Sequence, residues 1–201
     1  MLSSQEITDG LQKTVNDNPM LAIFWHAVIY AAIIAWFTTW QPSNRLLALS
    51  MCLPVLSVAI LAWLSGNPFN GTTFLILSAF ILIIGLRISL KPAALSEPVF
   101  VIAGILMVVF GLIYPHFTGQ TVVRHLYASP LGLIPCPTLS FLIGLILIFN
   151  GLGSKAIQLT LIGYGLFYGI FGILKLAVYV DLFLISGTLA LLGKYIITLK
   201  N

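Results

Sequence analysis

Charged residues are scarce in this sequence. Only 7% of its 201 residues are charged, whereas 60% are hydrophobic, and the mean hydropathy is +1.10. Soluble domains carry about 25% charged residues. The few charges of this chain cannot cover a water-facing surface, and an ordinary soluble protein is excluded. The net charge of +4 does not then indicate a nucleic-acid partner, because positive charge in a membrane protein mainly sets its orientation. We expect an integral membrane protein in contact with the lipid bilayer.

Cysteine is also rare, and the sequence lacks the common motifs of catalysis. The two cysteines, Cys52 and Cys136, fall toward opposite membrane faces in the spans described below, about 14 Å apart in depth. A disulfide needs Cα atoms within about 7 Å, which disfavours a bond between them. There is no CxxC, no HExxH, no glycine-rich phosphate loop and no pair of carboxylates within a span. The sequence predicts no cofactor, and enzymatic activity is not the favoured hypothesis.

The first nineteen residues are polar and lack the basic and apolar regions of a cleavable signal peptide. Ser3 and Glu6 have the spacing of a capping box. Ile7, Leu11 and Val15 follow at intervals of four residues. Residues 1–19 are therefore expected to form a short helix at the membrane interface, and a loosely ordered terminus is the alternative.

Seven apolar segments follow this polar region. A membrane-spanning helix needs about 20 mostly apolar residues, and turn-forming sequences such as QPSNR, GNPFNG and KPAALSEP separate the candidates. The predicted spans are 20–40, 46–65, 72–90, 98–114, 131–151, 156–177 and 181–199. We expect an all-α, polytopic protein in which residues 20–199 form a single transmembrane helical domain with an outer loop at 115–130.

The distribution of lysine and arginine predicts the orientation. With seven spans and the N-terminus outside, six of these cations lie on the inner side and three on the outer side, which obeys the positive-inside bias. The inner group is Arg45, Arg87, Lys91, Lys155, Lys194 and Lys200, and the outer group is Lys13, Arg124 and Lys175. The opposite orientation, or six spans with the last two fused, would reverse the bias. The prediction is N-out and C-in.

Aromatic residues and glycines add two expectations. Aromatic side chains near span ends are typical interface anchors, and the candidates are Trp40, Trp63, Tyr114 and Tyr195. Gly165 and Gly169 have GxxxG spacing in the sixth span, which lets helix backbones approach closely. We expect these glycines to pack within the fold, and an oligomer contact is the alternative.

The fifth span begins in the stretch SPLGLIPCPTLSFLIG, residues 129–144. Pro135 and Pro137 have no N–H, so the carbonyls four residues before them lose their helical partners. Unpaired backbone at membrane depth is tolerated only inside protein or beside a wet cavity. The helix from Pro137 to Asn150 would be about 21 Å long, less than the hydrocarbon core of about 30 Å. We predict a fifth helix that is broken or re-entrant at Pro135-Cys136-Pro137 and sheltered by its neighbours.

Candidate binding residues lie on the predicted outer side. His26 is an ionisable residue within a span, which is often functional, although a neutral histidine bonded to a neighbouring helix is equally consistent. Asn67, Cys136 and Asp181 complete the set. Asp181 could also cap the last helix or pair with Lys175. A metal site is a further hypothesis, with His116, His125 and Cys136 as ligands.

The chain resembles the uncharacterised polytopic bacterial membrane proteins grouped as "domain of unknown function 6064". The matching elements, in order, are Asn18 with Trp25, Asn67-Pro68, Tyr114-Pro115, the stretch GLIPCPTLSFLIGLIL (132–147) and Asp181-Leu182. Pro-Cys-Pro-Thr is the most specific of them. The resemblance implies a polytopic protein of the bacterial cytoplasmic (inner) membrane and carries over no activity.

Three functions are consistent with these features. The first is transport of a small solute or ion through an outward-facing site at the broken fifth helix, which predicts a cavity lined by residues 131–135. The second is a non-catalytic subunit or assembly factor that binds a membrane protein partner, or a second copy, through glycine-rich spans and the outer loop. The third is metal handling by the outer histidines and Cys136.

Overall fold

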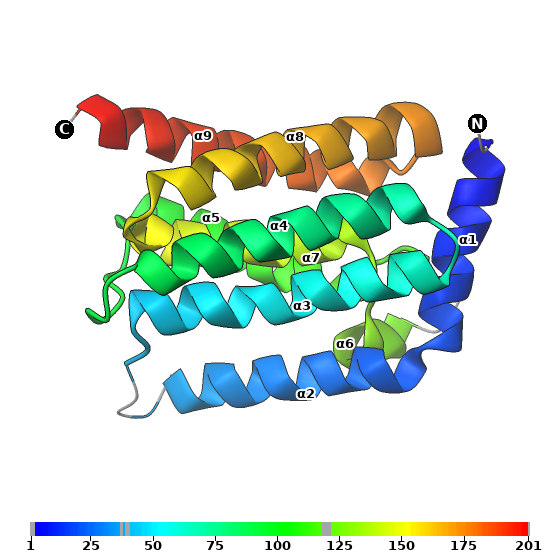
Figure 1. The fold of residues 1–201 in the computed structure, drawn as a ribbon, viewed down its shortest axis with the longest axis horizontal. Coiled ribbons are helices and arrows are strands. Elements are labelled where there is room, and N and C mark those ends of the chain that lie inside the picture. Colours follow the sequence, from blue (N-terminus) through cyan, green and yellow to red (C-terminus); the bar gives the residue numbers. More distant parts are fainter. Residues whose placement is uncertain (1–2, 37, 39–40, 118–121, 201) are drawn as a thin grey trace.

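The computed structural model describes residues 3–36, 38, 41–117 and 122–200 (Figure 1). Within this part of the chain all regular elements are helices, which confirms the all-α prediction. The apolar helices are α2 (Pro19–Trp36), α3 (Asn44–Leu64), α4 (Pro68–Arg87), α5 (Pro98–Ile113), α7 (Pro135–Ile148), α8 (Lys155–Leu176) and α9 (Leu182–Lys200). The shorter elements are α1 (Ser4–Asp17), α6 (His125–Ala128) and three 3-10 helices, Val122–Arg124, Asn150–Gly153 and Tyr179–Asp181.

Among the residues that the structure describes, five helical segments are long and apolar enough to cross a membrane: α2, α3, α4, α8 and the segment Tyr179–Lys200 that contains α9. The other two apolar helices are shorter. α5 has 16 residues and α7 has 14, which correspond to about 24 and 21 Å of helix. Each of the seven predicted spans thus contains an apolar helix, but only five of these helices have the length of a complete span.

The long helices lie alongside one another, and α1 runs across one end of the bundle (Figure 1). We call this end the α1 end. There the chain passes from α1 to α2, from α3 to α4, from α5 to α7 and from α8 to α9. The remaining connections lie at the opposite end, including that from α7 to α8. The connection from α5 to α7 contains the whole of the predicted loop 115–130, of which residues 118–121 lie outside the described part.

Helix α7 forms the centre of the bundle. Twelve of its 14 residues are buried, and it contacts α3, α5, α8 and α9. Its contact with α5 is close because glycines face each other: a Cβ on Gly104 would lie 2.7 Å from the Gly144 carbonyl oxygen, and a Cβ on Gly144 would lie 2.7 Å from the Gly104 oxygen. Small residues allow such backbone contact between apolar helices, and it keeps α7 away from the outside of the bundle.

The prolines of the fifth span lie in the first turn of α7. The helix begins at Pro135, two residues earlier than expected, because neither Pro135 nor Pro137 needs an N–H in a first turn. The residues before it, Leu131 to Ile134, form a buried turn rather than a helix. The chain before Pro135 is therefore non-helical and sheltered, whereas Pro135, Cys136 and Pro137, where the break was predicted, belong to the helix.

Thr138 satisfies the backbone of this turn. Its hydroxyl accepts a hydrogen bond of 2.9 Å from the Gly132 N–H and donates one of 2.8 Å to the Ile134 carbonyl. Gly132 has φ +75°, and the indole of Trp25 lies where a Cβ would be. A side-chain hydroxyl therefore replaces hydrogen bonds that a regular helix would make at this depth.

The structure tests the expected packing of the GxxxG glycines and the expected role of Tyr114 as an interface anchor. Cβ atoms on Gly165 and Gly169 would collide with Thr188 and Ile185 of α9, which confirms that the GxxxG pair packs within the fold. Tyr114 is fully buried, so its prediction as an interface anchor is wrong, because its hydroxyl has a partner inside the protein. Trp40 lies outside the described residues.

Candidate functional site

Asp181 is the centre of a polar cluster at the α1 end. Its side chain is 1% exposed. The Tyr114 hydroxyl donates a hydrogen bond of 2.7 Å to Oδ1, and the Cys136 thiol donates one of 3.2 Å to Oδ2. These three residues, which we call the Asp181 cluster, come from the end of α5, the start of α7 and the turn before α9. The structure brings together Cys136 and Asp181, which the sequence marked separately.

Local structure fixes the position of the carboxylate. The 3-10 helix Tyr179–Asp181 holds the residue, whose N–H donates to the Val178 carbonyl at 3.1 Å. Gly172 of α8 faces the carboxylate, and a Cβ at this position would collide with Oδ2. Glycine is thus required on α8 for the carboxylate to reach Cys136.

No cation accompanies this carboxylate among the described residues. Lys175 is exposed, and the predicted pair with Asp181 is wrong, because both carboxylate oxygens are bonded to Tyr114 and Cys136 instead. The same bonds direct the side chain away from the first turn of α9, which it was expected to cap. Burying an unpaired charge is costly, so the site favours either a proton or a cation at Asp181.

Two small cavities lie beneath α1, and the smaller of them adjoins the cluster. One has a volume of about 30 Å³ and is lined by Cys136, Asp181, Asn70 and Tyr168, among others. The second has a volume of about 60 Å³, and its lining includes Asn67, Asn70 and the turn residues Leu133, Ile134 and Pro135. Ile7 and Leu11 of α1 border both. A water molecule needs about 10–15 Å³ measured in this way, so each cavity has room for one or a few waters or a small cation.

Asn70 is a cavity residue that the sequence analysis missed. The Tyr168 hydroxyl donates to Asn70 Oδ1 at 3.0 Å and is 2.8 Å from the Thr73 hydroxyl. Asn67, a predicted binding residue, is the N-cap of α4 and accepts from the Asn70 N–H at 3.1 Å. The signal available in the sequence was the pair of asparagines in NPFN, which flanks the start of a span.

His26 lies outside this cluster and links two helices. Its Nδ1 is 2.8 Å from the Ala22 carbonyl of its own helix, and its Nε2 is 2.9 Å from the Leu112 carbonyl of α5. A neutral imidazole can donate to only one carbonyl, whereas an imidazolium can donate to both. The hydrogen bond to α5 is the contact with a neighbouring helix that the sequence analysis gave as the alternative to a functional role for His26.

The three predicted metal ligands are not assembled into one group. His116 packs edge-on against Phe117, with ring centroids 4.3 Å apart, and burial lowers the pKa of its imidazole. His125 begins α6. Within the described ranges, no three or more His, Cys, Asp or Glu side chains are grouped so that they could hold a metal ion. Both cysteines are free thiols.

Comparison with known protein families, with characterised proteins and with solved structures gives no match to this chain.

Proposed function

We propose that the chain is a seven-span membrane protein with the α1 end outside, and that α1 lies at the outer membrane surface. Charge supports this orientation. Lys13, Arg124 and Lys175 belong to the α1 end, whereas the other six lysines and arginines belong to the opposite end, as the positive-inside bias requires. The short helix α7 is preceded by the buried turn Leu131 to Ile134, and α5 is followed by the buried Tyr114. These non-helical residues would supply part of the remaining depth. A bacterial cytoplasmic membrane is part of the proposal.

We propose that the function is the uptake or release of a small cation, the proton included, through a site at the Asp181 cluster. One observation carries this proposal: a buried carboxylate, with no cationic partner among the described residues, borders a small cavity at the non-helical entry to α7. An ionisable residue at membrane depth is a functional-site hypothesis by default. Broken helices are the usual place for ion sites in transporters.

The size of the cavities narrows the class of ligand. Volumes of about 30 and 60 Å³ are far below the roughly 300–1,000 Å³ of sites for drug-sized molecules. Four of the residues that line the smaller cavity have polar side chains, namely Asn70, Cys136, Tyr168 and Asp181, and the other eight are apolar. Oxygen ligands suit a hard monovalent cation or a proton better than an organic solute.

Passage to the other side requires movement. Below the cluster α5 and α7 are in backbone contact, since a Cβ on Gly111 would lie 2.7 Å from the Pro137 carbonyl oxygen. On the outside, Ile7 and Leu11 of α1 border the cavities. We propose that α1 moves to admit the ion and that α7 moves against α5 to release it, so the structure represents a closed state.

Ion flux into liposomes tests the proposal. The purified protein is reconstituted into vesicles that contain a pH- or cation-sensitive dye, and gradients of H⁺, Na⁺ and K⁺ are applied in turn. Flux of one cation should exceed that of protein-free vesicles. Asp181→Asn should lower it about tenfold or more, because loss of a charged ligand costs at least about 1.5 kcal/mol of binding.

The matched control is Asp17→Asn, which removes an exposed carboxylate at the same end of the molecule. It should leave the flux unchanged. If the wild-type protein gives no flux above empty vesicles for any of the three cations, cation transport is abandoned. Equal losses in both variants would assign the effect to general surface charge rather than to the cluster.

A further inference from the structure

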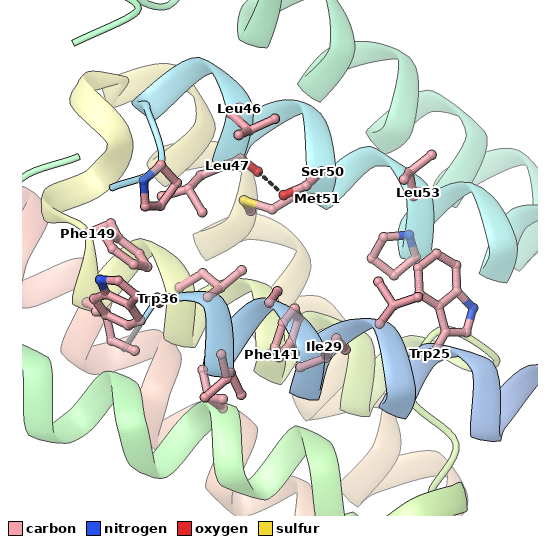
Figure 2. A pocket seen from close by; sticks show the side chains of 18 residues that line it. Trp25, Ile29, Trp36, Leu46, Leu47, Ser50, Met51, Leu53, Phe141 and Phe149 are labelled. Atoms are coloured by element: carbon pink, nitrogen blue, oxygen red, sulfur yellow. Dashed lines mark hydrogen bonds between the residues drawn. The ribbon is translucent and has the colours of Figure 1, made fainter. Parts of the chain in front are cut away.

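An apolar groove runs along the inside of α2, between this helix, α3 and α7 (Figure 2). Helix α2 contacts mainly α1 and α6, so its middle stands away from the bundle. The groove has a volume of about 290 Å³. Trp25 borders one end, and Trp36 borders the other, where its ring packs against Phe149 with centroids 4.6 Å apart.

The lining of the groove presents almost no polar group to an occupant. Apart from the two indoles, Ser50 is the only residue with a polar side chain among the described residues that line the groove. Its hydroxyl donates to the Leu47 carbonyl at 2.8 Å, which Figure 2 shows as a dashed line. The Trp25 N–H donates to Ser57 at 3.1 Å. Two of the three polar side chains are thus already hydrogen-bonded, and a groove this apolar favours a hydrocarbon ligand.

The dimensions fit one acyl chain. The eleven-residue step from Trp25 to Trp36 along α2 corresponds to about 16 Å, which is about half of the 30 Å hydrocarbon core and thus the depth of one leaflet. The groove, with about 290 Å³ over this length, is narrow and has the scale of a single chain.

Positive charge lies at the Trp36 end. Arg45 directly precedes the lining residue Leu46, and its Nε donates to the Ile88 carbonyl at 2.8 Å. The Lys91 carbonyl accepts from the Asn44 N–H at 3.0 Å, which places Lys91 beside the same turn. Residues 41–46 and 87–93 contain no Asp or Glu. A cationic turn at the end of an apolar groove is complementary to an anionic lipid headgroup.

We propose that this groove binds one anionic phospholipid, with an acyl chain between α2 and α3 and the phosphate beside Arg45 and Lys91. The lipid fills the space that separates α2 from the bundle and holds this helix in place. The proposal concerns a different surface from the Asp181 cluster and does not depend on cation transport.

Native mass spectrometry of the purified protein tests the proposal. The full-length protein in detergent is mixed with palmitoyl-oleoyl phosphatidylglycerol or with the zwitterionic phosphatidylcholine of the same chains, and retained lipids are counted. One phosphatidylglycerol should be retained in preference to phosphatidylcholine. Ala32→Phe, which fills the groove, should weaken retention about tenfold or more, which corresponds to about 1.4 kcal/mol.

Ala31→Phe is the matched control for the groove, because Ala31 is an exposed neighbour on α2 that does not line it. It should retain the lipid as wild type does. Lys91→Gln should reduce the preference for phosphatidylglycerol, whereas Lys155→Gln, an exposed cation at the same end on α8, should not. Equal retention by the Ala31 and Ala32 variants, or occupation of the groove by a second copy or a co-purified protein, overturns the proposal.

Discussion

The Tyr114 hydroxyl donates a hydrogen bond of 2.7 Å to Asp181 Oδ1 and so joins the end of α5 to the turn before α9. The Cys136 thiol joins the start of α7 to the same carboxylate. Three segments that are far apart in the sequence therefore share one acceptor. A change in the protonation or ligand state of Asp181 acts on all three segments at once, which couples the candidate site to the packing of α7.

Tyr114→Phe should destabilise the protein by about 1–3 kcal/mol, because it removes one donor from a buried carboxylate while filling nearly the same volume. The measurement is the free energy of unfolding in detergent, followed by circular dichroism. Tyr179→Phe is the control, since Tyr179 is exposed in the turn that holds Asp181. If both variants unfold alike, the hydrogen bond contributes nothing to stability.

Thr138→Val should cost about 1–3 kcal/mol, because valine has the shape of threonine but leaves the buried Gly132 N–H without an acceptor. Thr138→Ser keeps the hydroxyl and should cost about 1 kcal/mol or less for the lost methyl group. Hydrogen exchange of the Gly132 amide gives a local measurement, and it should become faster in the valine variant only. A valine variant as stable as the serine variant would contradict the assigned role of Thr138.

Gly104→Ala should cost about 1–3 kcal/mol or more, because its Cβ would meet backbone atoms of α7 and force α5 and α7 apart. Gly163→Ala on α8 is the matched control, since a Cβ at this position meets nothing within 4 Å. The control should be neutral or slightly stabilising, because alanine is the better helix former. Thermal unfolding of the two variants side by side decides the matter, and similar melting temperatures would rule out tight α5–α7 contact.

Acidification should loosen α1. The backbone N–H and the hydroxyl of Ser3 hydrogen-bond to Glu6 and lower the pKa of its carboxyl from the ordinary value of 4.5. Because the folded-state pKa is the lower one, the stabilisation is complete above pH 4.5 and is lost as the pH falls through the folded value. Amide protection in α1, relative to intrinsic exchange rates, should fall in this range. Glu6→Gln should remove the dependence, whereas Ser3→Ala, which keeps the backbone N–H, should remove only part of it. An unchanged pH profile in the Glu6 variant would contradict the assignment to the capping box.

Local chemistry explains how much of the fold the sequence could predict. The breaks between helices at 41–43, 65–67 and 88–97 contain Pro, Gly or Asn residues, which stop helices by their own backbone preferences. The capping box formed as expected for the same reason, since Ser3 and Glu6 are only three residues apart. Helix α5 lies at Pro98–Ile113, close to the predicted 98–114. Helix α7 covers only Pro135–Ile148 of the predicted span 131–151, because the buried residues before Pro135 form a turn.

The candidate site depended on contacts that no local pattern contains. Tyr114 and Asp181 are 67 residues apart, and the sequence could identify each only by its type. Asn70 gave a weak signal because asparagine is common at helix starts. Lys175 was expected near Asp181 because the two are close in the chain, but the direction of a side chain depends on how α8 rotates against its neighbours. Proximity in the sequence therefore gave a wrong pair for Asp181, because helix packing determines which side chains meet.

The burial of α7 also has a consequence for how the protein is made. The non-helical entry from Leu131 to Ile134 and the twelve buried residues of α7 are synthesised before α8 and α9, two of the helices that surround them. When α7 leaves the ribosome, its surroundings are therefore incomplete. The central helix can then reach its buried position only after α8 and α9 have been made, so these two helices complete the packing of a segment that precedes them in the chain.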